Sequence, residues 1–90
     1  MRRQYKDPQN QRVYDHYREH PPIKDGRRHR GSSDRAAFWN GVDGVALSGG
    51  RIPYRRLSYG WIIYMAGRDS RNDEAVRNAE RINIAHGVTG

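Results

Sequence analysis

The stretch AFWNGVDG, residues 37–44, puts two large aromatic side chains beside two glycines. Phe38 and Trp39 are neighbours, and Gly41 and Gly44 follow them three residues apart. A glycine inside a helix costs about 1 kcal/mol relative to alanine, so two of them need a structural reason. Because glycine has no Cβ, it allows another backbone to come close. We therefore expect a second element to pack against the face that carries these glycines.

The residues around this stretch have the spacing of a helix. Phe38, Val42 and Val45 recur at i, i+4 and i+7, which places them on one helical face. The Ser-Ser-Asp run at 32–34 offers N-cap residues, and the Ser-Gly-Gly run at 48–50 is a stop signal. The sequence therefore predicts a helix that extends from the first run to the second.

A second helix is predicted to follow Pro53. Its apolar face would consist of Leu57, Trp61, Tyr64 and Met65, and Gly67 would end it. We expect Trp61 to lie across the face that carries Gly41 and Gly44, so that the two helices form a hairpin. The alternative is that the glycines admit an RNA backbone. The predicted core residues are Phe38, Gly41, Gly44, Trp61 and Met65.

A third helix is predicted near the end of the sequence. Ser70 or Asn72 can cap it, and Gly87 suits its C-terminus. One face would be formed by Ala75, Ala79, Ile82 and His86. The predicted fold is all-α: a basic and mobile arm over 1–31, a helical hairpin over 32–69 and an amphipathic helix over 70–90.

The composition limits the class of protein. Leu, Ile, Val and Phe together make up 14 of 90 residues, about 16%, which predicts a small core of marginal stability. The chain has no cysteine, which excludes disulfides and thiolate metal sites and fits a cytoplasmic protein. The longest apolar run, WIIYMA, is too short to span a membrane, and no apolar run follows the basic start. We expect neither a membrane segment nor a signal peptide, and the oligomeric state is left open.

The charge is strongly positive and unevenly distributed. The net charge is +7, of which +5 falls on residues 1–31, +2 on 32–69 and zero on 70–90. Fifteen of the seventeen cationic residues are arginine. The planar guanidinium matches phosphate and stacks on bases, so this excess favours a nucleic-acid partner. A genome rich in G and C would also enrich arginine.

The arm contains a basic run and one motif. A short helix over 9–20 is possible, and the two prolines at 21–22 would end it. The run RRHR supplies Arg27, Arg28 and Arg30 as candidate RNA contacts. The letters HYREH at 16–20 match the H-x-x-E-H zinc pattern. No third ligand or enclosing scaffold accompanies this match, so we predict neither a metal nor another cofactor.

Three short segments within 37–68 resemble the ribosome modulation factor family. These bacterial proteins share the segments A-x-x-x-G-Y-x-A-G, C-P-Y and W-x-G-G-W-x-x-A-M-A, from which this chain departs at Val42, Gly44, Val45 and Ile52. The matching residues are Ala37, Gly41, Pro53, Tyr54, Gly60, Trp61, Met65 and Ala66. The resemblance implies two short helices joined by a linker. It also implies binding to the small ribosomal subunit near the 3′ end of its RNA, with silencing of ribosomes by pairing.

The predicted turn between the two helices carries the chemistry for such a contact. Arg51, Arg55 and Arg56 flank Pro53-Tyr54, so guanidinium groups could hold phosphates while the Tyr54 ring stacks on a base. The alternative is a solvated turn in which Tyr54 packs locally. We expect a non-catalytic protein that binds ribosomal RNA and modulates translation.

A rival hypothesis belongs to a different class. Short basic chains also occur among phage and mobile-element proteins that block a host protein complex, including inhibitors of bacterial immunity. Tyr5, Tyr14 and Tyr17, together with the arginines of the arm, would then serve as interface anchors. An enzyme is not expected, because the sequence has no nucleophile–base set and no phosphate-binding loop after a strand. A helix-turn-helix regulator is disfavoured by the long glycine-bearing link and the apolar second helix.

Overall fold

The computed structural model describes residues 2–22 and 33–89, with residues 82–89 as backbone alone. The described chain contains four α-helices, one 3₁₀ helix and no strand, which confirms the all-α prediction. The elements are α1 (Pro8–Glu19), α2 (Asp34–Asp43), η1 (Ser48–Gly50), α3 (Tyr59–Ser70) and α4 (Glu74–Thr89). Within this part of the chain, no helix is both long and apolar enough to cross a membrane.

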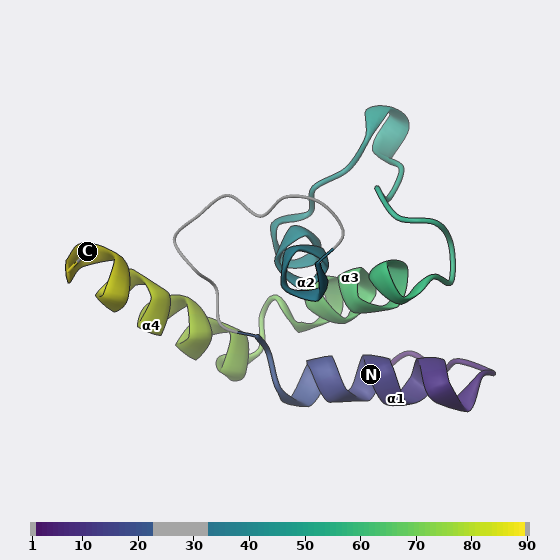
Figure 1. Cartoon of the computed structure of the whole chain (residues 1–90), viewed down its shortest axis with the longest axis horizontal. Coiled ribbons are helices and arrows are strands. Elements are labelled where there is room, and N and C mark those ends of the chain that lie inside the picture. The colour runs from purple at the N-terminus through teal and green to yellow at the C-terminus, as the bar shows by residue number, and fades with distance from the viewer. Residues whose placement is uncertain (1, 23–32, 90) are drawn as a thin grey trace.

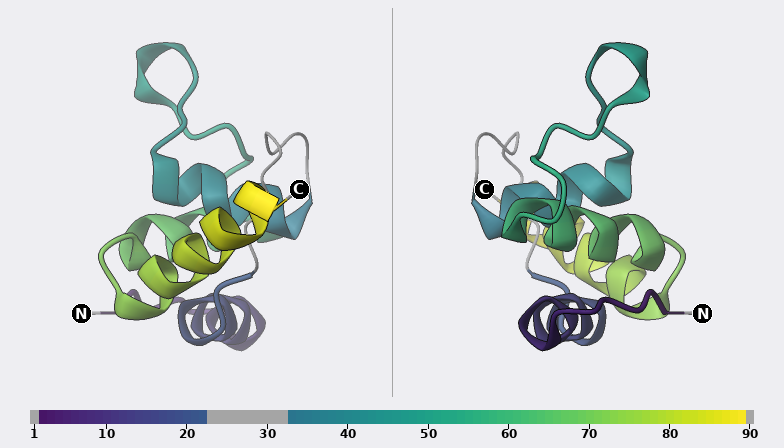
Figure 2. Two further views of the ribbon diagram at one scale, coloured as in Figure 1. Left: turned by 90° about the vertical axis from the view of Figure 1, so that its left-hand side faces the viewer. Right: turned by 90° about the vertical axis from the view of Figure 1, so that its right-hand side faces the viewer.

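Helices α1 and α2 both pack on α3. In Figure 1, α1 runs along α3, and α2 is seen nearly end-on where it crosses α3. Helix α4 follows α3 after a short turn and extends to the opposite side from η1. The views in Figure 2 show that η1 stands away from the helices. The loop that contains η1, residues 44–58, is therefore a projection from a helical globule.

Two glycines set the contact between α2 and α3. A Cβ on Gly41 would lie 2.9 Å from the carbonyl carbon of Tyr64 and closer still to its oxygen. A Cβ on Gly67 would meet Phe38 in the same way, 2.9 Å from its carbonyl carbon. Each helix therefore offers a glycine to the backbone of the other. The prediction that a second helix packs on Gly41 is confirmed, but Gly67 lies inside α3 rather than at its end.

Gly44 and Trp61 do not take their predicted places in this contact. Gly44 is the C-cap of α2, with a left-handed φ of 71°, and a Cβ added there would have no atom within 4 Å. Helix α2 thus ends before 48–50, and Val45 is 43% exposed. Trp61 is only partly buried and lies edge-on to the Tyr5 ring at 6.2 Å. It packs toward the N-terminal segment, so Tyr64 rather than Trp61 faces Gly41.

The core is larger than the predicted set. Phe38, Gly41 and Met65 are buried as expected. Helix α2 also buries four consecutive residues, 36–39, because it is covered on more than one side. Trp39 is fully buried, and its indole N–H donates a 3.1 Å hydrogen bond to the Pro22 carbonyl. The other fully or nearly fully buried residues outside the prediction include Tyr14, Ile62, Ile63 and Val76.

The structure of residues 2–22 corrects this part of the predicted mobile arm over 1–31. Helix α1 begins at Pro8 after Asp7, whose carboxylate accepts a hydrogen bond from the Gln9 N–H. Tyr14 is 0% exposed and belongs to the same cluster as Phe38. Aromatic side chains supply the apolar face that the few aliphatic residues of this segment could not. Arg27, Arg28 and Arg30 lie outside the described residues.

Candidate nucleic-acid interface

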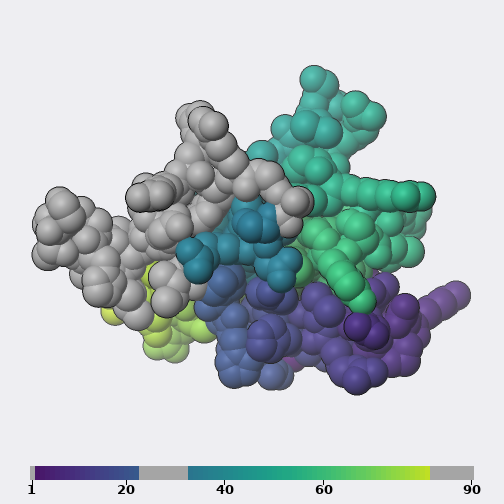
Figure 3. Space-filling view, in the orientation of Figure 1, coloured from purple at the N-terminus to yellow at the C-terminus, as the bar shows by residue number. Residues whose placement is uncertain are grey.

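The central feature of the charge distribution is a long segment without acidic residues. Residues 44–68 contain four arginines and no aspartate, glutamate, lysine or histidine, and they are bounded by Asp43 and Asp69. Arg51, Arg55 and Arg56 lie on the projecting loop, and all three are exposed. Figure 3 shows this loop as a protrusion from the surface. The structure therefore places three predicted site arginines on one exposed element.

These arginines form no salt bridge with the described residues of the protein. Within the part of the chain whose side chains are described, the salt bridges involve arginines from the first 18 residues. None of these ion pairs involves Arg51, Arg55 or Arg56. The acidic partners belong to α1, to the end of α3 and to the turn before α4. The loop thus presents its positive charge to solvent, away from the paired charges.

The exposed loop is anchored at its base and closed on itself. The Tyr64 hydroxyl donates a 2.6 Å hydrogen bond to the Val45 carbonyl. Burial raises the pKa of Tyr64, so this donor stays protonated at neutral pH. The Leu47 N–H donates to the Arg51 carbonyl at 2.7 Å, and the Gly50 N–H donates to the Leu47 carbonyl at 3.0 Å. These bonds give the arginine-bearing backbone a defined shape.

Tyr54 packs locally, which agrees with the alternative of a solvated turn. Its hydroxyl accepts a 3.1 Å hydrogen bond from Asn40 Nδ2 on α2. A Cβ on Gly60 would lie 2.7 Å from Tyr54 Cδ1, so the ring rests directly on the first turn of α3. The ring is also 5.9 Å from that of Tyr64. Tyr54 therefore positions the loop between α2 and α3, and its ring is not free to stack on a base.

Large apolar side chains are also exposed in this region. Those with substantial exposure are Val45 at 43% and Leu47, Leu57 and Tyr59 at 52% each. Leu57 has a φ of 65°, in the left-handed region that costs a residue with a Cβ about 1–2 kcal/mol. Strained backbone and exposed apolar surface both occur at binding segments. Sequence reasoning missed this property, because Leu57 and Val45 fit helical spacing and were assigned to buried faces.

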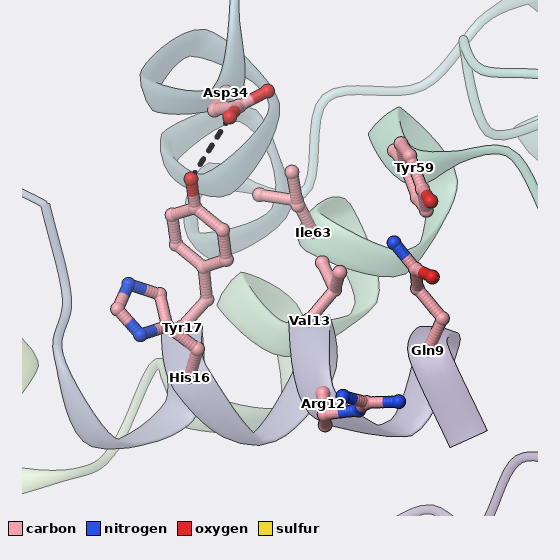
Figure 4. Close-up of a pocket in the computed structure, with 8 residues that line it drawn as sticks. All are labelled: Gln9, Arg12, Val13, His16, Tyr17, Asp34, Tyr59 and Ile63. Atoms are coloured by element: carbon pink, nitrogen blue, oxygen red, sulfur yellow. Dashed lines mark hydrogen bonds between the residues drawn. The ribbon is translucent and has the colours of Figure 1, made fainter.

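A groove of about 440 Å³ lies between α1 and α3, next to the start of α2. Its lining residues, shown in Figure 4, are Gln9, Arg12, Val13, His16, Tyr17, Asp34, Tyr59 and Ile63. The Tyr17 hydroxyl donates a 2.9 Å hydrogen bond to Asp34 Oδ2. The pKa of Tyr17 is raised to about 12, mainly by burial and to a smaller extent by this hydrogen bond. No sequence signal points to this groove, because its residues come from three separate helices.

The zinc-like motif spans the last turn of α1 and its C-cap, His20, and the rings of its two histidines lie close together. The ring centroids of His16 and His20 are 5.2 Å apart. Glu19 is engaged elsewhere, since its carboxylate accepts a 3.1 Å hydrogen bond from Arg2 Nη1. Among the described residues, no group of three or more potential ligands is placed to hold a metal ion.

Comparison of the chain with protein-family models, curated proteins and solved structures finds no significant match. The functional inference therefore rests on the charge, exposure and geometry of the loop and groove, together with the short motif resemblance within 37–68.

Proposed function

We propose that this protein binds RNA through loop 44–58 and acts without catalysis as a modulator of a ribonucleoprotein. The observation that carries the proposal is that residues 44–68 contain four arginines and no acidic residue. Three of these arginines lie exposed and outside the described salt bridges, on an element that projects from the globule. A guanidinium fork binds phosphate oxygens in two parallel hydrogen bonds, and each contact releases counterions from the RNA.

The anchoring of the loop supports the same proposal. A flexible arginine loop would lose conformational entropy on binding, which weakens the complex. Here the Tyr64–Val45 and Asn40–Tyr54 hydrogen bonds already fix both sides of the loop. The loop is thus prepared for binding while its arginines remain accessible.

The small ribosomal subunit is the ribonucleoprotein that we favour. The favoured partner follows from the resemblance to ribosome modulation factors over 37–68. Two of the matched pairs, Pro53-Tyr54 and Gly60-Trp61, are in contact here, because Gly60 makes room for the Tyr54 ring. These matched residues therefore hold the arginine loop against the first turn of α3. The resemblance thus covers the loop that we propose binds RNA.

A second candidate function is inhibition of a host protein complex. The exposed Val45, Leu47 and Leu57 favour it, since protein interfaces bury apolar side chains at their centres. The arginines would then meet an acidic protein surface instead of phosphates. Both candidates use the same loop, so the experiment must identify the partner.

The experiment is cosedimentation with purified small ribosomal subunits. We expect the wild-type protein to sediment with the subunits and the double variant Arg55→Ala/Arg56→Ala to remain largely in the supernatant. The matched control is Arg71→Ala/Arg77→Ala, which removes the same charge from exposed positions at the α3–α4 end. The control should sediment like the wild type. The proposal would be contradicted if both double variants lost sedimentation equally, or if the wild-type protein did not sediment with the subunits.

A further inference from the structure

We infer that the groove between α1 and α3 receives one base of the RNA strand that the loop contacts, with Tyr59 as the stacking ring. The inference rests on the proposed function and extends it to a second, uncharged contact. It replaces Tyr54 by Tyr59 as the aromatic residue that meets the RNA.

Tyr59 joins the arginine loop to the groove. It is the first residue of α3, directly after the loop, and it lines the groove. Arg55 and Arg56 precede it by four and three residues. A strand whose phosphates are held by these two arginines would therefore reach Tyr59 and the groove mouth within a short distance.

The Tyr59 ring is free for such a contact. It is 52% exposed, and none of the hydrogen bonds or ring contacts of the described residues engages it. Tyr54, in contrast, has its hydroxyl bonded to Asn40 and its ring against Gly60. Stacking needs an open ring face, because the base must lie flat on it. Only Tyr59 meets that condition among the described tyrosines at this end of the molecule.

The chemistry of the groove suits a base rather than a phosphate. Ile63 is buried and Val13 partly buried, and Figure 4 shows them between Tyr17 on one side and Tyr59 on the other. The Asp34 carboxylate lies on the Tyr17 side, where it would repel a phosphate. An uncharged base fits the apolar floor of the groove, and the Asp34 carboxylate keeps the phosphate backbone of the RNA outside.

The size and rim of the groove agree with this occupant. A volume of about 440 Å³ lies within the range of pockets that hold small ligands such as a single nucleotide. Arg12 is exposed at the rim, where it can contact the phosphate that leads out of the groove. Gln9 adds an amide that can donate to and accept from the edge of a base.

The test uses a single-stranded oligoribonucleotide that carries one 2-aminopurine, whose fluorescence is quenched by stacking. We expect Tyr59→Ala to lower affinity about 5- to 150-fold and to abolish the protein-dependent quenching. The salt dependence of binding should not change, because stacking is not ionic. Tyr59→Phe should restore both quenching and affinity. Circular dichroism will verify that each variant is folded.

The comparison variant is Leu57→Ala, which removes an apolar side chain of the same exposure from the RNA-binding loop itself, two residues away. Any loss of affinity that it causes should leave the quenching of the bound oligoribonucleotide intact, because Leu57 is not the stacking ring. If Tyr59→Ala binds and quenches like the wild type, the groove inference is wrong, while RNA binding by the loop still stands. If Leu57→Ala reduces affinity and quenching as much as Tyr59→Ala, the contact is a general apolar patch and the inference is also wrong. If the wild type does not bind the oligoribonucleotide at any salt concentration, the proposed function itself fails.

Discussion

The Tyr14 hydroxyl on α1 donates a 2.6 Å hydrogen bond to Asp69 Oδ2 on α3, across 55 positions of the sequence. Arg3 Nε donates to the same oxygen at 2.8 Å, and Arg18 Nη1 donates to the Tyr14 hydroxyl at 2.9 Å. Burial and the bond to Asp69 raise the pKa of Tyr14, so the hydroxyl remains a donor at neutral pH. This network fastens the N-terminal segment and α1 to the helix on which the arginine loop is mounted.

Removing the Tyr14 hydroxyl should loosen this attachment. We expect Tyr14→Phe to lower the free energy of unfolding by about 1–3 kcal/mol, because Asp69 loses a donor and Arg18 loses an acceptor. Urea titration followed by circular dichroism measures the change. Tyr17→Phe is the control, since its bond to Asp34 is exposed and should contribute less. Equal stability of Tyr14→Phe and wild type would show that the network does not hold α1 in place.

The glycine contact between α2 and α3 should not tolerate a methyl group. We expect Gly41→Ala and Gly67→Ala each to destabilise the protein by about 1–3 kcal/mol, because a Cβ at either position overlaps the facing backbone. The double variant should cost less than the sum, since one shift of the helices relieves both overlaps. Gly44→Ala is a contrasting variant that loses stability through its left-handed φ of 71° and not through overlap, because its Cβ would meet nothing within 4 Å. Thermal melting of the four variants makes the comparison, and an unchanged melting temperature for Gly41→Ala would refute the close approach.

The two tryptophans should differ in their contribution to stability. Trp39 is 0% exposed, so Trp39→Ala should cost about 3–5 kcal/mol, which is comparable with the whole stability of a small domain. Trp61 is only partly buried, and its replacement by alanine should cost clearly less. Circular dichroism should show lost helicity in the first variant and native helicity in the second. The reverse order would mean that Trp61, as its helical spacing predicts, holds the hairpin together.

Two partly buried tyrosines predict a loss of stability at alkaline pH. The pKa values of Tyr5 and Tyr17 are raised from 10.0 to about 12, mainly by burial. The unfolded chain therefore loses these protons before the folded protein does. The stabilisation is complete below pH 10 and is lost as the pH rises from 10 toward 12. Urea titrations across this range should show stability falling with pH, and less steeply for Tyr17→Phe; a flat profile in the wild type would contradict these shifts.

Helical spacing and glycine placement were enough to predict the all-α class and the close approach at Gly41. They were not enough to place Trp61, because periodicity shows which residues share a face but not which neighbour covers that face. The packing of α1 was missed because its one fully buried side chain is the aromatic Tyr14, with Val13 and Tyr17 partly buried beside it. At the candidate site, the local sequence singled out Arg51, Arg55 and Arg56, which the structure places on one exposed loop. It could not separate Tyr54 from Tyr59, since that difference depends on the contact of Tyr54 with Gly60.

The most direct test of RNA binding by the loop is the salt dependence of affinity for a single-stranded fragment of small-subunit ribosomal RNA. Each phosphate contact contributes about −0.7 to the slope of log K against log salt concentration. We expect Arg55→Ala/Arg56→Ala to make the slope shallower by about 1.4 and to weaken binding. Arg71→Ala/Arg77→Ala should keep the slope of the wild type. One common shallow slope for all three proteins, with no preference for RNA, would contradict the account and favour a protein partner.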